Sequence, residues 1–227
     1  MMVELKICGL CAVRDVALCQ RYGVDMAGFV VDYPEPVPWN LTPAEAAPLL
    51  AAARGRLATC VVSGGPPAKV LELARLLRPD AVQLHYKESF AETVYLAEEL
   101  AKLGVQVFKA LPIRADGRPE MAEFSTLAQA VAAFNQTAVA RLLLDSRLAA
   151  CPAASSRPLS SELYAEIAHH SQKPLVLAGG LNAANLPGIL AALQPAAVDI
   201  LSGAEAAPRQ KDEQKIAAIC AACGKNK

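Results

Sequence analysis

Residues 174–181 read Pro-Leu-Val-Leu-Ala-Gly-Gly-Leu, a run of apolar residues that ends in two glycines. The run has no polar position, so both faces of a strand formed here are expected to be buried, as in parallel strands covered by helices. Seven other short runs in the chain are also mainly apolar. The eight strand candidates are residues 3–8, 26–31, 57–62, 81–84, 105–111, 141–145, 174–178 and 198–201.

Longer segments with Ala, Leu, Glu and Lys at helical spacing separate these runs. They cover residues 12–22, 43–54, 67–77, 88–103, 121–135, 160–169, 183–193 and 212–223. Eight strand–helix units favour a closed barrel over a doubly wound sheet, which usually has five or six strands and a glycine-rich first turn. We therefore predict the α/β class, with residues 1–227 forming a single (β/α)8 TIM barrel.

The composition excludes several classes of partner. Apolar residues make up 54% of the chain, and the 22 Lys and Arg residues are balanced by 22 Asp and Glu residues. Such a balance offers no bulk charge to nucleic acid or to an anionic membrane. No apolar stretch approaches the roughly 20 residues of a membrane-spanning helix, and no signal segment is recognised. We expect a cytoplasmic monomer or homodimer that binds neither nucleic acid nor membrane.

The seven cysteines include two pairs with Cys-x-x-Cys spacing, Cys8/Cys11 and Cys220/Cys223. An odd number of cysteines without a signal segment argues against a disulfide framework. The two pairs together suggest a four-cysteine zinc site, but neither lies in the knuckle-like turn that such sites use. The simpler interpretation is small buried residues in helices, so we predict no metal.

Four of the expected strands end in residues that are able to carry chemistry. Cys8, Asp145, Gly179-Gly180 and Ser202-Gly203 follow or close the first, sixth, seventh and eighth strands, which places them on one rim of a parallel barrel. Loops after the last two strands of such barrels commonly bind phosphate, together with a short extra helix. Residues 204–208 are the candidate for that helical turn. Each feature alone has a structural explanation, but their combination predicts a site for a small phosphorylated metabolite.

Five motifs recur in order over about residues 3–219. They are Leu-Lys-Ile-Cys-Gly-Leu (5–10), Asp-Ala-Val-Gln-Leu-His (80–85), Leu-Leu-Asp-Ser (143–146), Leu-Ala-Gly-Gly-Leu (177–181) and Val-Asp-Ile-Leu-Ser-Gly-Ala-Glu (198–205). Together they resemble the phosphoribosylanthranilate isomerase family of tryptophan biosynthesis. The resemblance implies the same barrel fold and an isomerase that uses neither cofactor nor metal.

The resemblance also implies an Amadori rearrangement of N-(5′-phosphoribosyl)anthranilate to the 1-deoxyribulose phosphate. Cys8 would be the general base that removes the ribose C2 proton, and Asp145 the general acid that opens the furanose ring. The glycine-containing loops at 179–180 and 202–203 would hold the phosphate, with His85 at the rim. Because a thiol has an ordinary pKa near 8.5, Cys8 would need a lowered pKa to act as base.

Two loops depart from the family's pattern. The family has a Ser-Pro-Arg motif after the second strand, whose arginine binds the anthranilate carboxylate, and here Trp39 stands at that position. A neutral ring cannot replace a bidentate guanidinium. The stretch 147–159 contains no glycine, although the family has a glycine-rich loop there, and Arg147 is a candidate for the missing cation. Two alternatives therefore stay open: an isomerase for another phosphorylated sugar or aminosugar, and a non-catalytic barrel that binds a phosphate ligand.

Lys6 lies inside the first expected strand. If its side chain points into the barrel, the buried ammonium needs an acidic partner, and Asp145 and Asp199 are the candidates.

Overall fold

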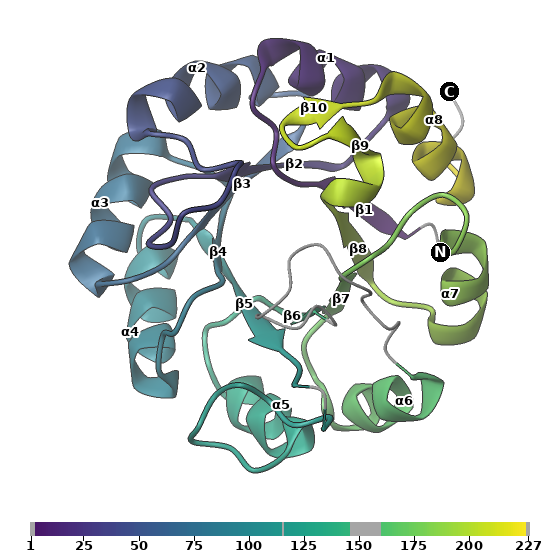
Figure 1. Cartoon of the computed structure of the whole chain (residues 1–227). Coiled ribbons are helices and arrows are strands. Elements are labelled where there is room, and N and C mark those ends of the chain that lie inside the picture. The colour runs from purple at the N-terminus through teal and green to yellow at the C-terminus, as the bar shows by residue number, and fades with distance from the viewer. Residues whose placement is uncertain (1–2, 115, 146–159, 226–227) are drawn as a thin grey trace.

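The computed structural model describes residues 3–114, 116–145 and 160–225. Eight parallel strands pair in chain order, and the last pairs with the first, so that the barrel closes (Figure 1). The prediction of a single (β/α)8 barrel is confirmed. The barrel strands are β1 Glu4–Ile7, β2 Met26–Val30, β3 Ala58–Ser63, β4 Ala81–Leu84, β5 Gln106–Pro112, β6 Arg141–Asp145, β7 Leu175–Ala178 and β8 Ala197–Ile200.

Eight α-helices surround the barrel (Figure 1). They are α1 Val13–Tyr22, α2 Pro43–Ala53, α3 Pro67–Leu77, α4 Phe90–Ala101, α5 Leu127–Asn135, α6 Ser161–His170, α7 Leu186–Leu193 and α8 Glu213–Ala222. The expected helix at 121–135 was too long, because the side chain of Thr126 accepts a hydrogen bond from the backbone N–H of Gln129 and fixes the start of α5 there.

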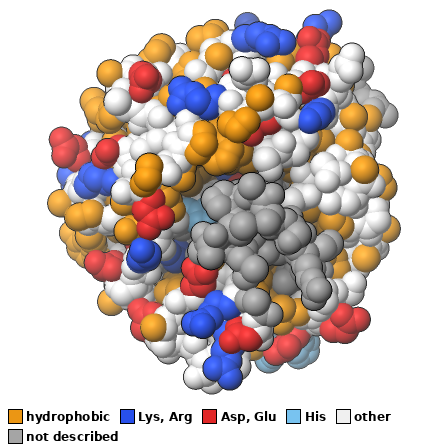
Figure 2. All heavy atoms as spheres, in the orientation of Figure 1, with side chains coloured by type: hydrophobic (Ala, Val, Ile, Leu, Met, Phe, Trp, Pro, Cys, Tyr) orange, Lys and Arg blue, Asp and Glu red, His pale blue; other side chains and the backbone are white. Residues whose placement is uncertain are grey.

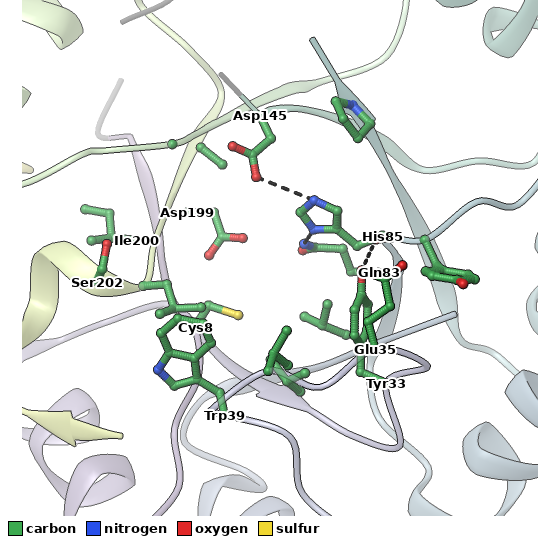
Figure 3. Close-up of a pocket in the computed structure, with 18 of the residues that line it drawn as sticks. Cys8, Tyr33, Glu35, Trp39, Gln83, His85, Asp145, Asp199, Ile200 and Ser202 are labelled. Carbon is green, nitrogen blue, oxygen red and sulfur yellow. Dashed lines mark hydrogen bonds and ion pairs between the residues drawn. The ribbon is translucent and has the colours of Figure 1, made fainter. Parts of the chain in front are cut away.

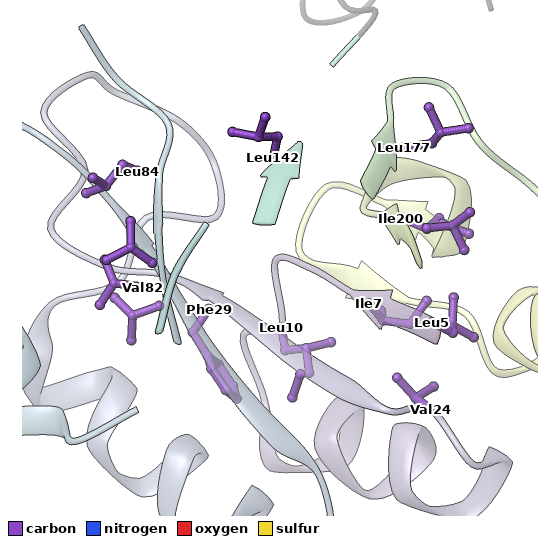
Figure 4. Close-up of a cluster of buried hydrophobic side chains, with 14 of the residues drawn as sticks. Leu5, Ile7, Leu10, Val24, Phe29, Val82, Leu84, Leu142, Leu177 and Ile200 are labelled. Atoms are coloured by element: carbon purple, nitrogen blue, oxygen red, sulfur yellow. The ribbon is translucent and has the colours of Figure 1, made fainter. Parts of the chain in front are cut away.

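The main core lies between the strands and the helices (Figure 4). Leu5 and Ile7 of β1, Phe29 of β2 and Val82 of β4 point outward into this layer and are at most 1% exposed. Residues between them on each strand point into the barrel, because side chains alternate along a strand. Lys6 and Cys8 therefore share the interior face of β1 and of the turn that follows it.

The end of the barrel at the strands' amino termini is closed by charged and aromatic side chains. Glu4 and Arg141 form an ion pair of 2.7 Å across the interior, and the Arg141 guanidinium lies 5.0 Å from the centroid of the Phe108 ring. A guanidinium over an aromatic face is an attractive arrangement. The opposite end, where the strands' carboxyl termini lie, is hollow.

The segment after β8 differs from the expectation. The predicted helical turn at 204–208 is wrong: a short 3-10 helix, η1 Ser202–Ala204, is followed by a two-stranded hairpin of β9 Glu205–Ala207 and β10 Gln210–Lys211. Arg209 adopts a left-handed φ of 68° at the tip of the hairpin. The Lys211 ammonium then returns to lie 3.0 Å from the Glu205 carboxylate, and this buried contact favours a hairpin over a helix.

Candidate active site

A cavity of about 330 Å³ opens over the carboxyl ends of the strands, which is where barrel enzymes place their active sites. In the view down the barrel (Figure 2), a histidine side chain is visible at the centre of this face. Eight of the nine predicted site residues line the cavity: Cys8, Trp39, His85, Asp145, Gly179, Gly180, Ser202 and Gly203. The ninth, Arg147, lies outside the described residues.

Cys8 follows β1 directly and points into the cavity (Figure 3). Its backbone N–H donates to the Ile200 carbonyl at 2.8 Å, which fixes the turn against β8. A Cβ at Gly28 of β2 would lie 2.9 Å from Cys8 Sγ and 3.1 Å from Lys6 Cε, so the glycine provides the space for both side chains. Burial raises the pKa of the Cys8 thiol above its ordinary value, and the Lys6 ammonium offsets only part of this effect. This upward shift of the Cys8 pKa is opposite in direction to the one that the role of general base would need.

Below Cys8 lies a buried ion pair. Lys6 Nζ is 2.7 Å from Asp199 Oδ2, and the side chains are only 4% and 7% exposed. Of the two partners that the sequence offered for Lys6, the structure selects Asp199, which faces Lys6 in the β1–β8 register. Burial alone lowers the pKa of Lys6, but the Asp199 carboxylate raises it above its ordinary value, so Lys6 stays charged.

Asp145 ends β6 and faces the cavity, where it is 3% exposed. His85 Nε2 lies 3.5 Å from Asp145 Oδ2, and His85 Nδ1 lies 3.3 Å from Gln83 Nε2 (Figure 3). An amide nitrogen donates, so Nδ1 is the accepting nitrogen and Nε2 carries the proton that faces Asp145. This chain of contacts from β4 orients the Asp145 carboxylate.

The loops after β7 and β8 pack against each other at one side of the cavity. Gly179 and Gly180 have φ values of 96° and 63°, the left-handed region that glycine enters without strain. A Cβ at Gly203 would lie only 1.9 Å from the Leu181 carbonyl oxygen, so no other residue fits there. Backbone at these positions approaches the cavity without intervening side chains, as phosphate-binding loops require.

Trp39 lies in the loop after β2 and lines the cavity beside Cys8 (Figure 3). Its indole Nε1 donates to Glu205 Oε1 at 2.7 Å, and its Cδ1 would lie 3.0 Å from a Cβ at Gly9. Glu205 also pairs with the buried Lys211. The tryptophan is therefore held by Glu205 and packs closely on Gly9, so it forms a fixed apolar wall and supplies no cation.

The sequence did not single out an aromatic and charged wall on the β2 and β4 loops. The Tyr33 hydroxyl donates to the His85 carbonyl at 2.6 Å, and the rings of Tyr33 and Tyr86 meet edge to face at 5.9 Å. Lys87 Nζ lies 5.2 Å from the centroid of the Tyr86 ring and 3.1 Å from Glu35 Oε1. In the sequence, Tyr86 and Lys87 directly follow His85. Their contacts with residues 33–35 form only because the closed barrel brings the loops after β2 and β4 together.

Two further predictions concern a zinc site made by cysteines and helices that could span a membrane. In the ranges that the structure covers, no three His, Cys, Asp or Glu side chains gather as a metal site would need. Cys8, Cys11, Cys220 and Cys223 are all free thiols. None of the helices in the described ranges is both long enough and apolar enough to span a membrane.

Comparison with known proteins supports one family. The model of the N-(5′-phosphoribosyl)anthranilate (PRA) isomerase family matches residues 5–222. The enzyme of that name from Natronomonas pharaonis is 31% identical over 224 residues, covering 98% of this chain and 99% of its own. The one from Azorhizobium caulinodans is 34% identical over 225 residues, which is 96% of this chain and 90% of its own.

Solved structures agree with the sequence comparison. The crystal structure of phosphoribosyl anthranilate isomerase from Thermotoga maritima superposes with a TM-score of 0.81 at 25% identity, covering 98% of this chain and 99% of that one. A crystal structure of the same enzyme type in complex with reduced 1-(o-carboxyphenylamino)-1-deoxyribulose 5-phosphate has a TM-score of 0.78, also at 25% identity, with coverage of 98% and 99%. The chain therefore belongs to the N-(5′-phosphoribosyl)anthranilate isomerase family.

Proposed function

We propose that this protein catalyses the Amadori rearrangement of N-(5′-phosphoribosyl)anthranilate, with Cys8 as general base and Asp145 as general acid. The observation that carries the proposal is the placement of these two groups. They enter one cavity from different sides, on β1 and β6, beside the glycine loops of β7 and β8 (Figure 3). The test is turnover of phosphoribosylanthranilate by the purified protein, followed by the loss of substrate fluorescence.

The two groups have separate tasks. Asp145, in its protonated form, gives a proton to the furanose ring oxygen, and the bond from that oxygen to C1 breaks to leave an iminium ion. The iminium makes the C2 proton acidic, and the Cys8 thiolate removes it to form an enolamine. The enolamine then takes a proton at C1 and loses one from its C2 hydroxyl, which gives the ketone. Neither group has to move, because acid and base face the sugar from different sides.

The high pKa of Cys8 limits the fraction of active protein near neutral pH. A base acts only when deprotonated, and burial raises the pKa of this thiol. The Lys6 ammonium below it favours the thiolate, and a cationic iminium beside the sulfur would favour it further.

We therefore expect kcat/KM to keep rising as the pH is raised through and beyond about 8.5, the ordinary pKa of cysteine. The rate falls at lower pH because the buried thiol regains its proton. The measurement is a profile of kcat/KM against pH, which reports the pKa of groups in the free enzyme. A profile that is already flat at pH 7 would show that Cys8 is not the base or that its thiolate is stabilised.

Lys87 is our proposed partner for the substrate carboxylate. Of the residues that both line the cavity and are described by the structure, it is the one with a Lys or Arg side chain. Its partner Glu35 is 51% exposed and Lys87 is 78% exposed, and such exposed pairs contribute little. A substrate carboxylate can therefore replace Glu35 beside the ammonium, with the aromatic ring stacked near Tyr86.

Lys87→Met is expected to raise KM for phosphoribosylanthranilate by about tenfold and to leave kcat within about twofold, because the contact is the same in ground and transition states. Glu35→Gln is the matched control: it removes the competing carboxylate and is expected to lower KM. Steady-state kinetics of the two variants decide the matter. An unchanged KM in Lys87→Met would mean that the carboxylate is bound elsewhere.

A second candidate function is isomerisation of a related phosphorylated aminosugar without a carboxylate. The observation that favours it is the charge of the lining, which contains the carboxylates of Glu35, Glu120, Asp145 and Asp199 against the single ammonium of Lys87 in the described wall. The two candidates are separated by comparing phosphoribosylanthranilate with the corresponding aniline glycoside. A higher kcat/KM for the aniline compound would favour the second candidate.

A further inference from the structure

The loop after β2 forms one wall of the cavity, and its sequence gives it few backbone donors. Three of the residues between Tyr33 and Asn40 are prolines, which carry no backbone N–H. The Asn40 side chain closes the base of the loop, since it accepts from the Tyr33 N–H at 2.8 Å and donates to the Tyr33 carbonyl at 3.0 Å. The residues within this closure, which include Trp39, therefore depend on contacts with other segments.

The hairpin of β9 and β10 supplies two of these contacts. The indole Nε1 of Trp39 donates to Glu205 Oε1 at 2.7 Å. Arg209 Nη1 donates at 2.7 Å to the carbonyl of Pro38, which belongs to the peptide group that joins Pro38 to Trp39. The two bonds span 166 and 171 residues of sequence. The hairpin therefore holds the tryptophan through its side chain and through its backbone.

Glu205 is itself fixed in place. Its Oε1 also accepts from the Lys211 ammonium at 3.0 Å and from the Arg209 backbone N–H at 3.2 Å. Glu205 and Lys211 are buried, and a charge-assisted hydrogen bond is stronger than one between neutral groups. The acceptor of the indole N–H is therefore a fixed carboxylate and not a mobile surface group.

Arg209 has a backbone conformation that its residue type does not favour. Its φ is 68°, in the left-handed region, where a residue with a Cβ is strained and glycine is not. Such strain persists where the surrounding contacts maintain it, and it concentrates at functional sites. The turn itself does not need an arginine, so the bond from the guanidinium to Pro38 is the contact that uses one.

We propose that Arg209 is a positioning residue that acts with Glu205: together they clamp the loop after β2, so that the Trp39 indole stands fixed as a wall of the ligand site. In Figure 3 the indole lies next to Cys8, on the side of the cavity opposite Asp145. A ligand that binds against this wall does not have to order it, which lowers the entropy cost of binding. The inference rests on the proposed function for the identity of the ligand, but not for the position of the tryptophan.

Arg209→Gly separates this role from a purely structural one. Glycine relieves the left-handed conformation while it removes the guanidinium, so the fold is not weakened by the loss of the clamp. Arg78→Gly is the matched control, because Arg78 also has a left-handed φ, 46°, and follows α3 at the end of the barrel where the strands begin. Arg209→Lys is the conservative variant, which keeps a cationic donor.

The first readout is the fluorescence of Trp39, the only tryptophan in the sequence, in the ligand-free protein. We expect Arg209→Gly to unfold at the temperature of the parent or above, and yet to show stronger quenching of this fluorescence by acrylamide. The quenching rises because the released loop exposes the indole more often. Arg78→Gly and Arg209→Lys should be quenched like the parent.

The second readout is the dissociation constant for reduced 1-(o-carboxyphenylamino)-1-deoxyribulose 5-phosphate, by isothermal titration calorimetry. We expect Arg209→Gly to weaken binding by about fivefold, which corresponds to one net hydrogen bond, and the two comparison variants to stay within about twofold of the parent. In a Trp39→Ala background the effect of Arg209→Gly should disappear, because effects that pass through one shared residue are not additive.

Unchanged quenching in Arg209→Gly would overturn the proposal. A loss of affinity that persists in full in the Trp39→Ala background would also overturn it, since Arg209 would then act on the ligand through its charge and not through the tryptophan. Failure of the proposed function has a different signature. The parent would then neither turn over phosphoribosylanthranilate nor bind the analogue, while the quenching of Trp39 would still respond to Arg209→Gly.

Discussion

Replacement of Cys8 by serine is expected to reduce kcat for phosphoribosylanthranilate by about 10³-fold, within the range for loss of a general base. A serine hydroxyl fits the space beside Gly28 and leaves the turn after β1 in place. Its pKa, however, lies far above that of a thiol, so it does not ionise at the pH of the assay. The measurement is single-turnover kinetics, which isolates the chemical step from product release.

Cys11→Ser is the matched control for this prediction. The Cys11 thiol lies three residues further along the chain and donates to the Gly9 and Trp39 carbonyls, and a hydroxyl can also do this. We expect its kcat within about threefold of the parent, as for a substitution outside the chemistry. Binding of reduced 1-(o-carboxyphenylamino)-1-deoxyribulose 5-phosphate should be nearly unchanged in Cys8→Ser. Activity that survives in Cys8→Ser would show that the base is another group.

Asp145→Asn is expected to cause a loss of similar size, about 10³-fold in kcat, because an amide has no acidic proton to give to the ring oxygen. Asparagine keeps the shape of the side chain and one oxygen to face His85 Nε2. KM should change little, since the contact serves the transition state for ring opening. Steady-state and single-turnover assays with the same substrate measure both effects.

The outcome that contradicts this assignment is a variant with high kcat and raised KM. Asp145 would then bind the substrate without transferring a proton. The pH profile of the variant provides an independent check, because the residual rate should still rise with pH as long as Cys8 remains the base.

The fold was predictable because each strand is marked in the sequence by a short apolar run. The run Leu175–Ala178 is apolar throughout, and similar runs recur between helical segments, so closure into a barrel followed from their number. The positions of Cys8 and Asp145 followed from the same logic, since each closes a parallel strand. The motifs then added the family.

The failures concern contacts between residues far apart in the chain. The bond from the Trp39 indole to Glu205 spans 166 residues of sequence, and nothing local predicts it. The turn expected at 204–208 was wrong for the same reason, because Lys211 returns to Glu205 and makes a hairpin. The direction of the pKa shift at Cys8 depends on burial, which motif matching does not report.

The contact between Lys87 and Glu35 is another feature that the sequence did not predict. A lysine after His85 is unremarkable in a sequence, and its pairing with the loop after β2 comes from the neighbouring positions of β2, β3 and β4 in the barrel. The surroundings of such loop residues are set by tertiary neighbours, whereas the positions of Cys8, Asp145 and the glycine loops are set by the ends of the strands.

The most direct test of the account is the turnover of phosphoribosylanthranilate by the purified protein, recorded as loss of its fluorescence over a range of enzyme concentrations. We predict a rate that is proportional to enzyme concentration, rises with pH above 8, and disappears in Cys8→Ser while Cys11→Ser retains it. A protein that binds the reduced product analogue but shows no turnover at high enzyme concentration and alkaline pH would contradict it.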